Sequence, residues 1–98
     1  MYIKIHKTYR DVIAICDVEL LGQKFEEGKF QLDLKENFYG GNKQTQEEAI
    51  KIMKEFNAED ATFNIVGEKS IQTALQAGII TENSIGKIAG IPFTLILV

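Results

Sequence analysis

Apolar and polar residues alternate with a period of two in several short segments, which is the spacing of half-buried β-strands. Ile3 and Ile5 alternate with polar neighbours, and residues 12–16 form the β-branched run VIAIC. The five residues between these two segments, 7–11, predict a hairpin. Further strands are predicted where apolar residues alternate or run together, over residues 30–34, 61–65 and 91–98.

Two other segments show the three-to-four-residue spacing of amphipathic helices. The first covers residues 45–56 and begins with Thr45 and Glu48, which have the spacing of a capping box. The second covers residues 68–77 and is followed by Gly78, a residue that suits the left-handed conformation at a helix end. The sequence therefore predicts one helix before and one helix after the strand over residues 61–65 in chain order.

The order of these elements predicts an α+β fold. We expect a two-layer sandwich, in which a mixed sheet of four to five strands carries the two helices on one face. The apolar run over residues 91–98 fits a strand in or next to the centre of that sheet. Residues 23–28 are expected to form a loop. The chain of 98 residues shows no linker or repeat, which predicts a single domain over residues 1–98.

Composition narrows the class of protein. Eleven basic and fourteen acidic residues give a net charge of −3, which argues against general affinity for nucleic acid. The single cysteine, Cys16, excludes an internal disulfide and favours a cytoplasmic location, and its apolar strand predicts a buried, slowly reacting thiol. Signal-peptide and membrane-helix patterns are absent, so we expect no membrane partner.

No pattern of residues predicts an enzyme, a metal centre or a cofactor. Residues 66–70 follow a predicted strand and end in Lys-Ser, but they lack the glycine spacing of a phosphate-binding loop. His6 is the only histidine, and one histidine with one cysteine is too few for a usual zinc site. We assign no catalytic residue, metal ligand or cofactor. A small enzyme with a site near His6 and Asp17 is an alternative, which requires both side chains in one cleft.

Two segments are candidate binding surfaces. Phe38, Tyr39, Gly40 and Gly41 place two aromatic rings beside a glycine pair, a composition typical of loops that contact partners. The first ten residues combine cations with rings and contain no acid, which is the composition of surfaces that bind single-stranded RNA. The residues concerned are Tyr2, Lys4, His6, Lys7, Tyr9 and Arg10.

Several short motifs also follow one another in a specific order along nearly the whole chain. They are Cys16-Asp17-x-Glu19-Leu20-Leu21-Gly22, Phe25-x-Glu27-Gly28, Phe38-Tyr39-Gly40-Gly41, Asn64-Ile65-Val66-Gly67-Glu68, Ala77-Gly78-Ile79-Ile80 and Gly90-Ile91-Pro92. The set resembles the archaeal domain-of-unknown-function family numbered four hundred and twenty-four. The resemblance implies an archaeal cytoplasmic protein with an α+β two-layer fold, and it brings no activity, cofactor or catalytic residue.

These observations predict a non-enzymatic module that contacts a protein or a ribonucleoprotein. The resemblance suggests archaeal information processing, translation included, as its setting. RNA binding through the basic and aromatic hairpin is the alternative. The sequence assigns no particular partner and no oligomeric state.

Overall fold

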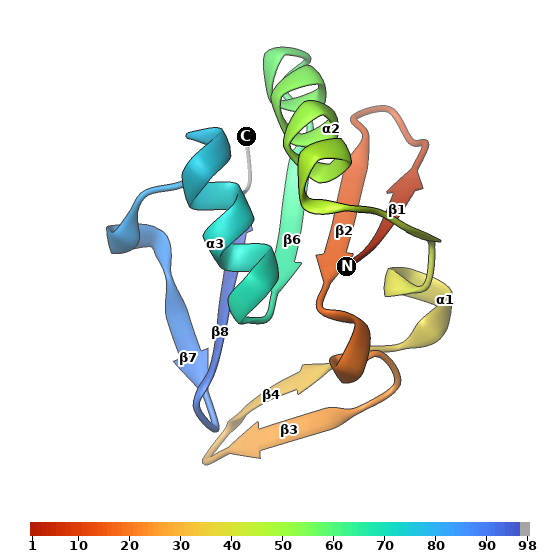
Figure 1. The fold of residues 1–98 in the computed structure, drawn as a ribbon. Helices are drawn as coiled ribbons and strands as arrows, with labels where there is room; N and C mark the ends of the chain where they lie inside the picture. Colours follow the sequence, from red (N-terminus) through yellow and green to blue (C-terminus); the bar gives the residue numbers. More distant parts are fainter. Residues whose placement is uncertain (97–98) are drawn as a thin grey trace.

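The computed structural model describes residues 1–96, which are built around a mixed β-sheet (Figure 1). Its six strands are β1 (Tyr2–His6), β2 (Val12–Cys16), β5 (Asn42–Lys43), β6 (Thr62–Val66), β7 (Gly86–Ile88) and β8 (Ile91–Ile96). Their order across the sheet is β5-β1-β2-β6-β8-β7, and only β2 and β6 pair in parallel. The prediction of four to five strands is wrong, because β5 and β7 are too short to show a period in the sequence.

Helices α2 (Gln46–Ala58) and α3 (Glu68–Ala77) cover one face of this sheet, as the sequence predicts (Figure 1). The capping box of α2 is present: the Glu48 amide donates to Thr45 Oγ1 over 3.2 Å, and the Thr45 amide donates to Glu48 Oε1 over 2.8 Å. Gly78 closes α3 in the left-handed conformation, with φ of 75°. The core between helices and sheet includes Ile3, Ile13, Ile15, Met53, Phe56, Phe63, Ile65, Ile71 and Ala74.

The second face of the sheet carries a partial third layer, which the predicted two-layer sandwich lacks. Its elements are the 3-10 turn η1 (Val18–Leu20), the strands β3 (Lys24–Glu27) and β4 (Phe30–Asp33), and the short helix α1 (Glu36–Tyr39). The side chains that join this layer to the sheet are Leu20, Leu34 and Tyr39 on one side and Ala14, Cys16 and Val66 on the other. The run VIAIC is thus nearly all buried because both of its faces are covered.

Strands β3 and β4 form a hairpin that differs from the predicted pattern. Residues 24–27 are a strand where a loop is predicted, because Phe25 is their only apolar residue and no alternation is visible. The strand predicted over residues 30–34 exists, but it pairs with β3 in a separate two-stranded sheet. The sequence pattern cannot show this, because alternation gives the period of a strand and not its partner.

Strand β8 lies beside the central strand β6, as its apolar composition predicts. Residues 97 and 98 of the predicted strand lie outside the described residues. The 3-10 turn η2 (Glu82–Ser84) closes over β8, where Thr94 Oγ1 donates to the Ser84 carbonyl over 2.9 Å. Leu95 departs from the prediction of burial on both faces, because 55% of its surface is exposed. Among the described residues, no helix is long and apolar enough to cross a bilayer.

Candidate functional site

The two candidate surfaces meet in the structure, because α1 packs beside β1 (Figure 1). His6 Nε2 donates to the Phe38 carbonyl over 2.8 Å, and the two rings stack with centroids 4.6 Å apart. The Lys4 ammonium donates to the Asn37 carbonyl over 2.8 Å. These side chains satisfy carbonyls at the end of α1 that have no partner within the helix. Strand β1 and the Phe38 segment therefore form one continuous surface.

Within the segment Phe38–Gly41, the four residues have different roles. The Tyr39 ring is buried in the core, and burial raises the pKa of its hydroxyl to about 12. A Cβ atom at Gly41 would overlap the Ile3 carbonyl, so this glycine allows the chain to pass close to β1. The half-buried Phe38 ring is the side chain of this segment that a partner can reach.

The six residues of the basic hairpin do not share one face. Tyr2 packs on the core of the second face, whereas Lys7 forms an ion pair with Asp11 over 3.2 Å and lies 5.4 Å from the centre of the Phe56 ring. Tyr9 is fully exposed at the tip of the hairpin. The ammonium groups of Lys4 and Lys7 are thus engaged by acceptors of this chain, which leaves them less available to phosphates.

His6 and Asp17 lie at opposite ends of the sheet. In the register of β1 and β2, His6 is opposite Val12 and Tyr2 is opposite Cys16, so the two side chains are separated by roughly 15 Å of strand. Asp17 is 3% exposed and already accepts three hydrogen bonds from α3. In the part of the chain that the structure describes, no three His, Cys, Asp or Glu side chains are grouped to hold a metal ion.

Asp17 also occupies the place that an anion would take at the start of α3. Its carboxylate accepts from the Ser70 amide over 2.8 Å, from the Ser70 hydroxyl over 2.7 Å and from the Lys69 amide over 3.1 Å. The Asp17 side chain makes no bond to η1, the turn that directly follows it in the chain. The start of α3, within residues 66–70, therefore holds a carboxylate of the chain itself where a phosphate loop would hold an anion.

A part of the second sheet face remains uncovered, and the sequence gives little sign of it. The register aligns Lys4, Ala14, Asn64 and Leu95 in one row across β1, β2, β6 and β8, on the side opposite α2 and α3. Ala14 is fully buried under the third layer, but Leu95 is 55% exposed. In the next row, Val12 lies beside His6 and is half-buried.

We name this area the open sheet face and define it by Phe38, His6, Val12, Asn64 and Leu95. It crosses four strands, a width of roughly 14 Å. Sequence analysis identifies Phe38 and His6 but misses Leu95, because an apolar residue in an apolar run gives no sign of exposure. The exposure of Leu95 depends on how far the third layer extends over the sheet, which the sequence does not indicate.

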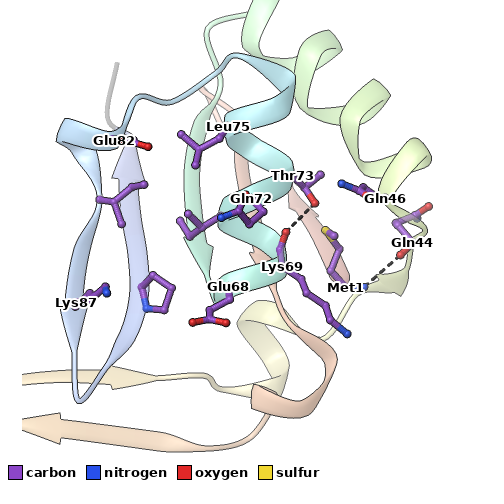
Figure 2. A pocket seen from close by; sticks show the side chains of 13 residues that line it. Met1, Gln44, Gln46, Glu68, Lys69, Gln72, Thr73, Leu75, Glu82 and Lys87 are labelled. Carbon is purple, nitrogen blue, oxygen red and sulfur yellow. Dashed lines mark hydrogen bonds between the residues drawn. The ribbon is translucent and has the colours of Figure 1, made fainter.

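A hollow lies along α3, on the opposite side of the sheet from the open sheet face (Figure 2). Its volume is about 890 Å³, within the range of small-molecule sites. Half-buried Leu75 and Ile85 line it together with exposed charged side chains such as Glu68 and Glu82. Every buried side-chain nitrogen or oxygen in the described part of the chain has a hydrogen-bond partner, so the hollow contains no buried polar group that awaits a substrate.

Cys16 is completely buried, as predicted. Burial, with a smaller contribution from the neighbouring Asp17, raises the pKa of its thiol to about 12. We therefore expect slow reaction of the native protein with a thiol reagent at neutral pH and rapid reaction after addition of urea, because only the exposed thiolate attacks. Rapid labelling of the folded chain would instead show that Cys16 is accessible and reactive.

Comparison with known proteins identifies the same fold and no activity. The model of a family described as "Protein of unknown function (DUF424)" matches residues 5–98. A solved structure, of an uncharacterized conserved protein from Methanopyrus kandleri, is similar with a TM-score of 0.87 and 29% sequence identity. The similarity covers 97% of this chain and 88% of that chain. No curated protein matches the sequence.

Proposed function

We propose that this chain, which belongs to the family described as "Protein of unknown function (DUF424)", is a non-catalytic module that binds another protein through the open sheet face. The proposal includes a cytoplasmic location, because a free buried thiol suits a reducing compartment. It also includes a partner in archaeal information processing, alone or within a ribonucleoprotein.

The exposure of Leu95 carries this proposal. A sheet face that stays in water normally carries polar residues, whereas Leu95 is apolar and 55% exposed, at a level of β8 that β7 no longer flanks. The half-buried Val12 and Phe38 are further apolar side chains on this face, and the polar Asn64 of β6 lies between β2 and Leu95. Exposed apolar side chains on one face favour contact with a protein surface of the same character.

The charges beside this face indicate the kind of partner. The ammonium group of Lys4 borders it and donates to the Asn37 carbonyl with one of its three hydrogens. We therefore expect a partner surface with an apolar centre and carboxylates at its rim, because complementary charges at the rim favour association. An RNA partner is less well supported, since Lys7 is paired with Asp11 and the net charge is −3.

Affinity capture from native cells, with and without nuclease, tests this proposal. We expect Leu95→Glu to weaken binding of the captured partner about thirtyfold or more, because it places a charge in an apolar contact. The matched control is Tyr9→Ser combined with Arg10→Glu, which changes the exposed hairpin tip, and it should leave binding nearly unchanged.

The reverse pattern would contradict the proposal. If the hairpin-tip variant loses the partner and Leu95→Glu keeps it, the functional surface is the hairpin. Capture that also disappears with nuclease and falls steeply with salt would identify RNA, since three phosphate contacts on a single strand give a log–log slope of about −2.

A further inference from the structure

Strand β1 lies at one margin of the fold, where β5 pairs with only half of it (Figure 1). The Gln44 amide donates to the Met1 carbonyl over 2.8 Å, and Ile3 is opposite Asn42 in the register of β1 and β5. Because alternate residues of an antiparallel strand bond to the same side, Ile5 also directs its amide and carbonyl towards this edge. In the described part of the chain no strand pairs with β1 beyond Ile3 on this side, so the backbone groups of Ile5 have no ladder partner.

The segment that pairs with the first half of β1 leaves the edge at Gly41. The Gly41 backbone lies so close to β1 that a Cβ atom there would overlap the Ile3 carbonyl. Gly40 would be opposite Ile5 if the strand continued. Instead its amide donates to the Glu36 carbonyl over 2.7 Å, at the end of α1. The position beside Ile5 is therefore not filled by this segment.

The exposure of two isoleucines on the same strand shows the effect of the missing neighbour. Ile3 and Ile5 are two residues apart, so both side chains lie on the helix face. Ile3, which β5 flanks, is 4% exposed, whereas Ile5 is 38% exposed. On the other face, the half-buried rings of His6 and Phe38 border the same stretch of edge. An added strand would thus cover an apolar side chain on one face and reach the open sheet face on the other.

The lysines of β1 do not protect this edge in the usual way. A lysine that projects from an edge strand commonly prevents pairing with another chain. Here Lys4 donates to the Asn37 carbonyl on the second face. Lys7 is paired with Asp11 and its ammonium group lies 5.4 Å from the centre of a ring of α2 on the helix face. Both ammonium groups are held over the faces of the sheet, so neither is fixed across the edge at Ile5.

We propose that an extended segment of the partner protein adds to the sheet at Ile5 as a short further strand. A peptide backbone is the ligand that supplies the amides and carbonyls in the alternation that a strand edge needs. The residue opposite Ile5 is then apolar, because its side chain lies beside Ile5, and the residue opposite Lys4 is acidic. The inference rests on the proposed function, because the segment belongs to the protein that binds the open sheet face.

A second copy of the chain, paired through its own β1, does not fit this edge. Antiparallel pairing about Ile5 would place Lys7 of one copy beside Ile3 of the other, where Asn42 already pairs. Pairing about Lys7 would set two lysines directly opposite each other, which is unfavourable. The free stretch from Ile5 to Lys7 is short and suits a segment of only a few residues.

Selection of a random heptapeptide library, displayed in several copies on each phage particle, against the folded chain tests the inference. We expect enriched peptides in which an apolar residue adjoins an acidic one. N-methylation at alternate residues of a selected peptide should weaken binding about tenfold, because only every second amide faces β1, and N-methylation between them should have little effect. The absence of enrichment, or sensitivity without this period of two, overturns the proposal.

Hydrogen exchange of the chain locates the bound peptide. The Ile5 amide should exchange at least about tenfold more slowly in the complex, because it gains a hydrogen-bond partner, and the Tyr9 amide should not change. Ile5→Lys should weaken peptide binding, whereas Tyr9→Ser is the matched control at the exposed hairpin tip and should not. Protection at another strand with no change at Ile5 would contradict the assignment.

These results can be separated from the test of the proposed function. If Leu95→Glu loses the cellular partner but no peptide protects Ile5, the open sheet face binds a protein without strand addition, and this inference alone is wrong. If peptides add at Ile5 and Leu95→Glu keeps the partner, the edge binds an extended segment and the proposed function is wrong.

Discussion

Replacing Asp17 by alanine is expected to lower the free energy of unfolding by about 3 kcal/mol, because hydrogen bonds to a buried charged group are among the stronger ones. Asp17 is 3% exposed and accepts three hydrogen bonds, two from Ser70 and one from the Lys69 amide. The alanine leaves these donors without a partner at the buried start of α3, where the helix itself supplies none. Urea unfolding of the variant, with the slope compared as well as the midpoint, measures the loss.

Two further variants separate this interaction from a general effect of charge. Glu19→Ala removes an exposed carboxylate two residues away and should change the free energy of unfolding by less than about 0.5 kcal/mol. Asp17→Asn keeps one acceptor oxygen and should lose less than Asp17→Ala. If Asp17→Ala costs no more than Glu19→Ala, the carboxylate does not hold α3 in place.

Alanine at Gly67 is expected to cost at least about 3 kcal/mol, because its backbone lies in a region that is open almost only to glycine. The φ and ψ angles are 110° and 154°. A Cβ atom would also overlap the Asp17 carboxylate, whose two oxygens lie 2.6 Å from its ideal position. The substitution therefore strains the backbone and displaces the group that caps α3.

Gly78 provides the matched control at the other end of the same helix. Its φ is 75°, but a Cβ atom there would meet nothing within 4 Å. Gly78→Ala should cost about 1 kcal/mol, the penalty for a left-handed alanine alone. Thermal or urea unfolding of both variants gives the comparison, and equal losses at the two glycines would show that the overlap with Asp17 has no effect.

Helices α2 and α3 could be predicted because their signals are local. Thr45 and Glu48 form a capping box only three residues apart, and Gly78 ends α3 at the residue where the apolar period ends. The run VIAIC indicates a buried strand for the same reason. Each of these features depends on neighbours within one or two turns of chain, so composition and spacing are sufficient to find it.

The features that escaped prediction depend on distant parts of the chain. Asp17 looks like the cap of the turn that follows it, but it caps a helix that begins 51 residues later at Glu68. Strand β3 forms because its partner β4 follows and Phe25 reaches the core, although no alternation marks it. Leu95 resembles a core residue, and only the extent of the third layer leaves it exposed.

For the candidate site, the sequence predicts the right segments and not their relation. Phe38 and His6 are both candidates, yet their stacking depends on α1 packing against β1, which no spacing predicts. Tyr39 has the same aromatic character as Phe38 but lies in the core. Two adjacent rings on a short helix point to different sides, and one of them must fill the core.

Site-specific photo-crosslinking in native cells tests the central claim, that the open sheet face binds a protein, most directly. A photoreactive amino acid replaces Leu95 in one variant. In two comparison variants it replaces Tyr9 at the tip of the β1–β2 hairpin or Gln31 on the outer face of the β3–β4 hairpin. We predict a discrete protein adduct at position 95 that survives nuclease treatment, and none at position 31. A nuclease-sensitive adduct at position 9 with no adduct at position 95 would contradict the account.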